Sequence, residues 1–365
     1  MGPNTALMEF RLSFVSYLKN VISEKESGGF AKFCRGCLWL ATFPYRWIVA
    51  IRNRRFDQGK GVARARVPVI SIGNLTTGGT GKTPLVCYLA TRLRQLDLRV
   101  SILSRGYGAN ESGVNDEALE LEMRLPDVPH LQDPNRKKIA DIATEELAAE
   151  VLLLDDGFQH RKLHRDIDIV VVDATNPFGF GHLLPRGLLR EPIQNIERSD
   201  IAVINRCNFV DDTSISAIKK ELRKFKPTLP IALAWTVADK LVDCDGNAFD
   251  MKDFKGKSVA AICGIGNPSG FQSTLEQLGV NVIASKEFPD HHRYSRVDIE
   301  QISEWVETLD GCHALLCTQK DLVKIKLRKV ANVDLFAVQI STKIKRNEKV
   351  LWETIHAKMQ EPPVK

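Results

Sequence analysis

Short apolar runs alternate with stretches of helical periodicity from residue 67 onward. The first run, residues 67–73, is rich in β-branched side chains and ends in glycine, which predicts a buried strand. Leucines then recur at helical spacing over residues 85–96, which predicts an amphipathic helix. Further strands are expected at 99–103, 151–154, 168–173 and 201–205. This alternation predicts a parallel α/β sheet.

A second α/β unit is expected from residue 257, with strands at 259–263, 282–284, 314–317 and 335–338. Between the two units, residues 233–236 and 240–243 with a turn at 245–247 indicate a hairpin linker. The predicted organisation therefore has four parts: an N-terminal segment (1–66), a first lobe (67–230), the hairpin linker (231–256) and a smaller C-terminal lobe (257–365).

The N-terminal segment has a pattern of its own. Apolar residues recur at helical spacing over residues 10–21. Trp39 and Tyr45 then lie in an uncharged run, residues 37–45, that is well short of the ~20 residues needed to span a bilayer. Arg46 ends this run, and a second apolar run begins at Trp47. Two interpretations are open: a helix that lies on an anionic membrane surface, or a helix docked on the protein's own core. The stretch is followed by basic residues: Arg52, Arg54, Arg55, Lys60, Arg64 and Arg66.

Composition narrows the class of protein only slightly. The 365 residues are 44% hydrophobic and 26% charged, enough for more than one packed domain. The net charge of +6 favours an anionic partner such as a nucleotide or phospholipid. No aromatic stacking platform suggests a nucleic-acid partner, and no feature identifies a protein partner. The eight cysteines lie mostly in apolar runs, which favours a reducing compartment.

A glycine-rich loop separates the first strand from the first helix, which is the sequence context of a P-loop. Glycines let backbone N–H groups curl around phosphate oxygens, Lys82 is expected to reach the β- and γ-phosphates of ATP, and Thr83 is expected to ligate Mg²⁺. Thr76 replaces the first glycine of the usual pattern. The residues expected to bind the nucleotide are Thr77, Gly78, Gly79, Thr80, Gly81, Lys82 and Thr83.

Two acidic residues, Asp155 and Asp156, end the apolar run at 151–154 and are followed by a glycine. A carboxylate at the end of a buried strand beside a P-loop holds Mg²⁺ in P-loop enzymes. The alternative is an ordinary turn after a strand, which Asp-Gly favours. Together with the P-loop, the two acids favour a metal site made of Thr83, Asp155 and Asp156.

Seven stretches, in this order, resemble those of the tetraacyldisaccharide 4'-kinase family. They include Ser-Arg-Gly-Tyr-Gly, Asp-Asp-Gly-Phe-Gln-His and Thr-Gln-Lys-Asp, and the resemblance extends over roughly residues 35–360. Each motif alone is weak, but seven in order are specific. The matching residues are 69–84, 104–108, 155–160, 184–191, 263–268, 288–292 and 318–321.

The resemblance implies an activity and a setting. The family uses ATP and Mg²⁺ to phosphorylate the 4'-hydroxyl of a tetraacylated glucosamine disaccharide 1-phosphate, giving lipid IVA, and works at a membrane surface. It therefore favours the membrane interpretation of residues 1–66, and a P-loop NTPase-like lobe with a second, smaller α/β lobe. A bacterial member is expected at the cytoplasmic face of the inner membrane; the long N-terminus and drifted motifs favour a mitochondrial member from a eukaryote.

The resemblance also implies roles for individual residues. Asp116 matches the residue that accepts the proton of the sugar hydroxyl, and His291 matches the histidine that orients it, although Asn115 replaces a glycine of the family and His292 is adjacent. Because Lys82 and His291 come from different lobes, catalysis is expected to require lobe closure. By itself, Asp116 would be interpreted as a surface charge.

Seven more positions of the matching motifs have implied roles. Arg190 and Glu191 are expected to order the nucleotide or close the site. Gln159 and His160 are expected to brace the metal ligands. Ser104, Arg105 and Tyr107 either contact the disaccharide phosphate or form a turn: Ser104-Arg-Gly-Tyr107 directly follows an expected strand.

Two rival functions remain open from the residues. A P-loop GTPase or metallochaperone is the first, but the lysine of residues 318–321 comes one position too late for a guanine-binding motif. The second is a membrane-binding homologue that has lost its activity. The presence of Lys82, Thr83, Asp155 and Asp156 argues against that loss.

Overall fold

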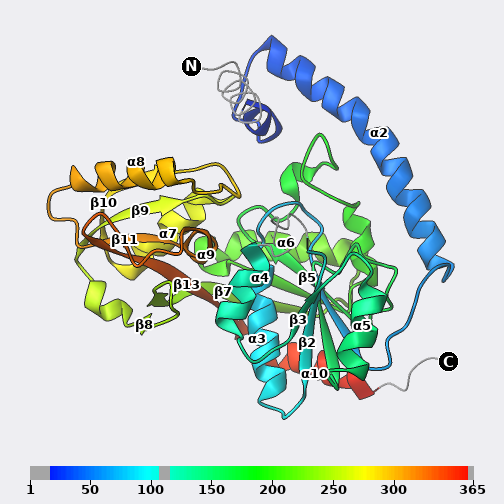
Figure 1. The fold of residues 1–365 in the computed structure, drawn as a ribbon. Coiled ribbons are helices and arrows are strands. Elements are labelled where there is room, and N and C mark those ends of the chain that lie inside the picture. Colours follow the sequence, from blue (N-terminus) through cyan, green and yellow to red (C-terminus); the bar gives the residue numbers. More distant parts are fainter. Residues whose placement is uncertain (1–16, 107–115, 361–365) are drawn as a thin grey trace.

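The computed structural model describes residues 17–106 and 116–360, and within them the strands form one 13-stranded sheet (Figure 1). The order along the sheet is β10-β9-β11-β13-β7-β6-β5-β1-β4-β2-β3, with β12 and β8 paired at the side. The strands are β1 (Val69–Gly73), β2 (Val100–Ser104), β3 (His130–Gln132), β4 (Val151–Asp155), β5 (Ile167–Asp173), β6 (Ile201–Asn205), β7 (Ile231–Val242), β8 (Ala248–Phe249), β9 (Ser258–Cys263), β10 (Asn281–Glu287), β11 (Ala314–Thr318), β12 (Lys329–Val330) and β13 (Val333–Arg346).

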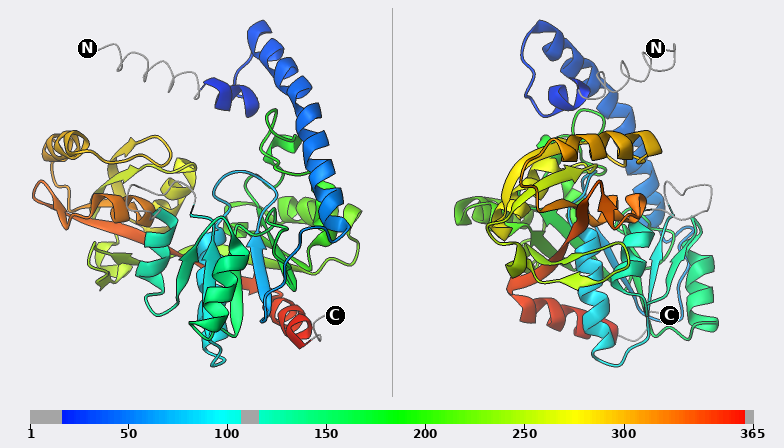
Figure 2. Two further views of the ribbon diagram at one scale, coloured as in Figure 1. Left: turned by 45° about the vertical axis from the view of Figure 1, so that its right-hand side comes forward. Right: turned by 60° about the vertical axis from the view of Figure 1, so that its left-hand side comes forward.

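Helices cover both faces of this sheet (Figure 2). In the first lobe, α3, α4 and α10 share one hydrophobic cluster with the central strands, and α5 and α6 pack on the other face. In the C-terminal lobe, α8 and α9 cover one face and α7 the other. The helices are α2 (Gly29–Asp57), α3 (Lys82–Arg94), α4 (Asp116–Arg124), α5 (Arg136–Glu145), α6 (Asp212–Phe225), α7 (Pro268–Leu278), α8 (Arg296–Glu307), α9 (Gln319–Ile325) and α10 (Glu348–Gln360).

The α/β fold predicted from the alternating pattern is confirmed. The central strands β1, β4, β5 and β6 pair in parallel and are buried along their whole length, so they appear in the sequence as continuous apolar runs. The two short strands expected at 233–236 and 240–243 are parts of one 12-residue strand, β7, which forms a hairpin with β8. The division into four parts stays a prediction.

One long strand, β13, connects the two halves of the sheet. It pairs in parallel with β11 and antiparallel with β7, with register shifts at Gln339/Ile340 and Ile344/Arg346. The helix that follows it, α10, returns to the first lobe, where Glu348 accepts a hydrogen bond from Tyr88 of α3 at 2.6 Å. The helix α10 is therefore packed on the helix that follows the P-loop.

The helix α2 lies along the outside of the first lobe (Figures 1 and 2). Residues 17–22 before it are helical, while Phe10 and Phe14 of the predicted amphipathic pattern lie outside the described residues, as do Tyr107 and Asn115. Among the described helices, none has the length and apolarity required to cross a membrane.

Candidate active site

The P-loop is shaped by two glycines with left-handed backbones and by one asparagine. Gly78 has φ 104° and Gly81 φ 82°, conformations that other residues rarely adopt. Gly81 is the N-cap of α3, so Lys82 is the first helical residue. Asn205, at the end of β6, donates its side-chain amide to the carbonyl of Thr80 at 3.2 Å. A Cβ at Gly81 would lie 2.1 Å from that amide nitrogen, so only glycine fits.

The loop has the features that a nucleoside triphosphate requires. Lys82 Nζ lies 3.2 Å from Asn74 Oδ1 and 3.3 Å from Asp156 Oδ1. The hydroxyl of Thr80 and the side-chain amide nitrogen of Asn74 are buried without hydrogen-bond partners in the described structure. By contrast, the backbone N–H of Thr77 donates to Leu188 at 2.7 Å, so this amide is already paired. A cation, a helix N-terminus and unpaired polar atoms therefore fit a phosphate group here.

Asp155 ends β4, which pairs with β1, the strand before the P-loop, and Asp156 directly follows it. Burial and the charge of Glu117 raise the pKa of Asp155 to about 7. Burial also raises the pKa of Asp156, but Lys82 and Arg190 outweigh it and bring that pKa to about 2. Carboxylates are the oxygen ligands that Mg²⁺ prefers, so the donor chemistry fits this ion.

Arg190 and Glu191 are adjacent in sequence but point to different partners. Arg190 Nη1 lies 2.8 Å from Asp156 Oδ2, which places its guanidinium beside the strand-end carboxylates. Glu191 is fully buried and pairs with Arg52 of α2 at 2.8 Å and with Arg198 at 2.7 Å. The backbone carbonyl of Arg190 also accepts a hydrogen bond from Tyr45 of α2 at 2.8 Å. Glu191 therefore holds α2, while Arg190 faces the site.

Gln159 contacts the backbone at Asn74, where the P-loop begins. Its side-chain amide donates to the carbonyl of Asn74 at 2.8 Å, and its side-chain carbonyl accepts from Arg190 at 3.3 Å. Burial and the nearby charge of Arg136 lower the pKa of His160 to about 4, which keeps its imidazole neutral at pH 7. Gln159 thus connects Asn74, at the start of the loop, to the guanidinium of Arg190, which contacts Asp156.

Asp116 and His291 meet across the two lobes. Asp116 begins α4, and His291 lies after β10 with a left-handed backbone, φ 59°. His291 Nδ1 lies 3.5 Å from Asp116 Oδ2, and this contact raises the pKa of His291. The adjacent His292 has its Nε2 3.3 Å from Asp298 instead. The structure thus brings together the two residues that the family resemblance pairs.

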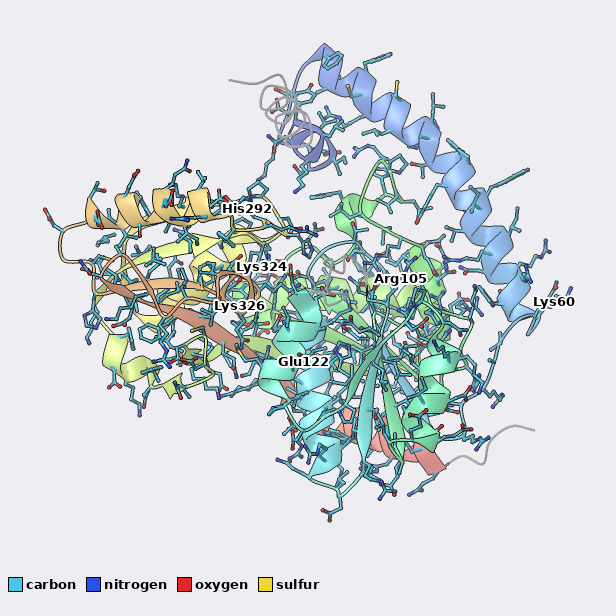
Figure 3. The ribbon with its side chains drawn as sticks, in the orientation of Figure 1. Lys60, Arg105, Glu122, His292, Lys324 and Lys326 are labelled. Carbon is cyan, nitrogen blue, oxygen red and sulfur yellow. The ribbon has the colours of Figure 1, made fainter. Side chains whose placement is uncertain are left out.

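The sequence analysis assigned no role in the site to three cations near these groups. Lys320 Nζ lies 3.0 Å from Glu117 Oε1, and Lys324 Nζ lies 3.2 Å from Asp116 Oδ2. Arg136 begins α5, is only 3% exposed, and its Nε has no hydrogen-bond partner within residues 17–106 and 116–360. Sequence gave no signal for Arg136, because helix N-termini usually favour acids. Figure 3 labels Arg105 in the first lobe and Lys324 in the other.

A strand, a glycine-rich loop and a helix, with two carboxylates at the end of the neighbouring strand, define a P-loop nucleotide-binding protein. The sequence profile of the family described as "Tetraacyldisaccharide-1-P 4'-kinase" matches residues 34–360. The chain belongs to this family.

Individual relatives and a solved structure agree with this membership. The chain is 36% identical over 345 residues to the tetraacyldisaccharide 4'-kinase of Anaeromyxobacter sp. strain K, covering 89% of this chain and 91% of the relative. It is 33% identical to that of Halothermothrix orenii, covering 92% and 96%. The crystal structure of LpxK from Aquifex aeolicus in complex with ATP is similar at a TM-score of 0.71 and 32% identity, covering 89% of this chain and 99% of that one.

Replacing Glu191 by glutamine tests its role as the anchor of α2. The change leaves Arg52 and Arg198 without their buried anion, so the free energy of unfolding is expected to fall by about 3 kcal/mol. Chemical denaturation followed by tryptophan fluorescence measures this change. Glu197→Gln, at an exposed position of the same segment, is the control and should unfold like the wild type. Equal stability of the two variants would contradict the anchoring role.

Proposed function

We propose that this chain transfers the γ-phosphate of ATP to the 4'-hydroxyl of a tetraacylated glucosamine disaccharide 1-phosphate, the reaction that forms lipid IVA in lipid A synthesis. The observation that carries this proposal is the pairing of Asp116 with His291 beside the P-loop, in a chain of the 4'-kinase family. The charges of Lys82 and Asp156 both affect the pKa of Glu117, which is next to Asp116. The Asp116–His291 pair therefore adjoins the nucleotide site.

The residues of the P-loop hold ATP in this proposal. The backbone N–H groups of Gly78, Gly79, Thr80 and Gly81 and the ammonium of Lys82 surround the phosphates. Thr83, Asp155 and Asp156 hold Mg²⁺, which neutralises phosphate charge when bound. Arg190 keeps the carboxylate of Asp156 oriented. Glu191 does not contact the nucleotide in this proposal; it fixes the backbone next to Arg190 and so helps to place the Arg190 side chain.

The chemical step follows from the groups that face each other. The 4'-oxygen of the acceptor forms a bond to the γ-phosphorus while the bond from that phosphorus to the bridging oxygen of ADP breaks. Asp116 takes the proton of the hydroxyl, and His291 holds the carboxylate in place. The 3.5 Å separation of the two side chains is long for a hydrogen bond. Closure of the lobes around both substrates shortens it in this proposal.

The 1-phosphate of the acceptor binds between Arg105 and Arg136 in this proposal. Arg105 directly follows β2, and Arg136 follows β3, which pairs with β2 in parallel, so both lie at the same edge of the sheet. Burial and the charge of Arg105 lower the pKa of Arg136. Two arginines that repel each other at a helix N-terminus are stabilised by an anion, and a phosphate has the matching geometry.

The acyl chains and the membrane contact α2 in this proposal. A cavity of about 400 Å³ lies between α2 and residues 181–194, lined by Trp39, Phe43, Leu183 and Ile193 among others. Large apolar side chains of α2 are also exposed, Trp47 at 73% and others between 49% and 67%. An exposed apolar helix with arginines along it binds an anionic membrane surface. The compartment, mitochondrial or bacterial inner membrane, stays a prediction.

The first test of the reaction uses the purified chain in detergent, with Mg²⁺-ATP and the tetraacyl disaccharide 1-phosphate. Mass spectrometry should show one added phosphate. Lys82→Ala should lower kcat by about 10²-fold or more, and Asp116→Asn by about 10²–10⁴-fold. Glu122→Gln, at an exposed position of the same helix as Asp116, is the matched control and should retain activity (Figure 3). Phosphate transfer that survives Asp116→Asn would show that another residue is the base.

Arg136→Ala tests the phosphate site of the acceptor. Losing a charged hydrogen bond should raise KM for the disaccharide 1-phosphate by about 10–100-fold. It should leave KM unchanged for the same lipid without its 1-phosphate. Lys138→Ala, at an exposed position of the same helix, is the control. A rise in KM for ATP instead would mean that Arg136 binds the nucleotide.

Ile48→Ser tests the membrane surface of α2. The isoleucine side chain is exposed in the protein and would be buried in the bilayer on docking, so its loss should weaken binding to anionic phospholipid vesicles about tenfold, measured by flotation. Val297→Ser on α8 removes an exposed apolar side chain far along the sequence, and should bind like the wild type. An equal effect of both changes, or none, would count against docking through α2.

A further inference from the structure

The helix α9 faces the start of α4 across the boundary between the lobes. Lys320 and Lys324 are four residues apart, so they lie on the same side of α9. Their ammonium groups meet two consecutive carboxylates of α4: Lys320 pairs with Glu117 at 3.0 Å and Lys324 with Asp116 at 3.2 Å. The motif at residues 318–321 therefore lies at the boundary where ion pairs join the two lobes.

Lys324 is unusually enclosed for a lysine. Its side chain is 9% exposed, and its Nζ makes no well-aligned hydrogen bond within the described parts of the chain. Taking an ammonium group out of water costs free energy, and attraction to Asp116 is the interaction that offsets this cost. A leucine or methionine could fill the same space without that cost. The charge itself is thus what needs an explanation.

The two partners of Asp116 both approach the same oxygen. Oδ2 lies 3.2 Å from Lys324 Nζ and 3.5 Å from His291 Nδ1. We propose that Lys324 is a positioning residue for the phosphoryl transfer: it fixes Oδ2 of Asp116 beside His291, so that the other oxygen, Oδ1, is presented to the acceptor hydroxyl. This inference rests on the proposed function, in which Asp116 accepts the hydroxyl proton.

The same helix also fixes the histidine. Asp321 is fully buried, and its Oδ1 accepts hydrogen bonds from the backbone N–H of Gly264 at 3.1 Å and from the hydroxyl of Tyr294 at 3.0 Å. The carbonyl of Gly264 in turn accepts from the backbone N–H of His291 at 3.2 Å. One short helix thus holds His291 through Asp321 and the base through Lys324. That placement explains the structural role of Asp321 in the Thr-Gln-Lys-Asp motif.

The charge of Lys324 also affects the titration of His291. The charged groups that face this imidazole are Asp116 of α4, Asp290 of its own loop, and Lys320 and Lys324 of α9. The hydrogen bond to Asp116 raises the pKa of His291, while the two lysines lower it. Removing the Lys324 ammonium removes a cation that repels the imidazolium of His291 and so disfavours its charged form. We therefore expect the pKa of His291 to rise in the variant.

The experiment compares Lys324→Met, Lys324→Arg and a control, Lys326→Met, whose lysine is exposed two residues later (Figure 3). NMR of histidine-labelled protein measures the pKa of His291, assigned from the spectrum of His291→Gln. Steady-state kinetics with ATP and the disaccharide 1-phosphate give kcat and KM. Lys324→Met should raise the pKa of His291 and lower kcat by about 10–100-fold, with little change in either KM. Lys324→Arg should restore both values, and Lys326→Met should change neither.

Each outcome separates the positioning role from the alternatives. If the wild type is active and Lys324→Met matches it in kcat and in the pKa of His291, the positioning role is wrong. If the wild type transfers no phosphate, the proposed function fails. If Lys324→Met does not fold, Lys324→Gln replaces it, because an uncharged amide can still form hydrogen bonds at this polar site. The same rise in the pKa of His291 is then expected. A loss of kcat without any change in the pKa would indicate a merely structural role and would overturn the proposal.

Discussion

The antiparallel pairing of β7 with β13 is the constraint on which the two-lobed arrangement depends. Register positions such as Lys343 opposite Trp235 and Val338 opposite Leu241 join strands that lie about a hundred residues apart in the chain. Because β13 also pairs with β11, the C-terminal lobe is joined to the first lobe within one sheet. The packing of α10 against Tyr88 then fixes this helix to the helix of the P-loop. These contacts bring α9 and the His291 loop to the start of α4.

Electrostatics then divides the work among similar groups. Asp155 and Asp156 are adjacent, yet burial raises the pKa of Asp155, while Lys82 and Arg190 outweigh burial and lower the pKa of Asp156. Asp116 is held between a lysine and a histidine at the other side of the nucleotide site. Each carboxylate thus has a different charge environment, set by which cation the fold places next to it. In the proposed reaction, this separation allows metal ligation and proton transfer to occur side by side.

The adjacent residues Arg190 and Glu191 connect the exterior of the molecule to this centre. Glu191 holds α2 from the inside, through Arg52, while Arg190 contacts Asp156. Tyr45 adds a second contact from α2 to the same short segment. A short chain of contacts therefore connects α2 to Asp156. In the proposed function, it links the helix that contacts the membrane to a carboxylate that would hold the metal.

The sequence by itself determined the central strands, the P-loop and the carboxylates after β4, because burial on both faces and tight turns leave local patterns. It also gave the resemblance that paired Asp116 with His291. Only the tertiary structure decided that these residues, 175 positions apart, touch, that Lys324 joins them, and that Glu191 points toward α2. A charged residue has no periodicity that names its partner. The meeting of Lys324 and His291 with Asp116 depends on the pairing of β13 with β7, and no local pattern encodes that pairing.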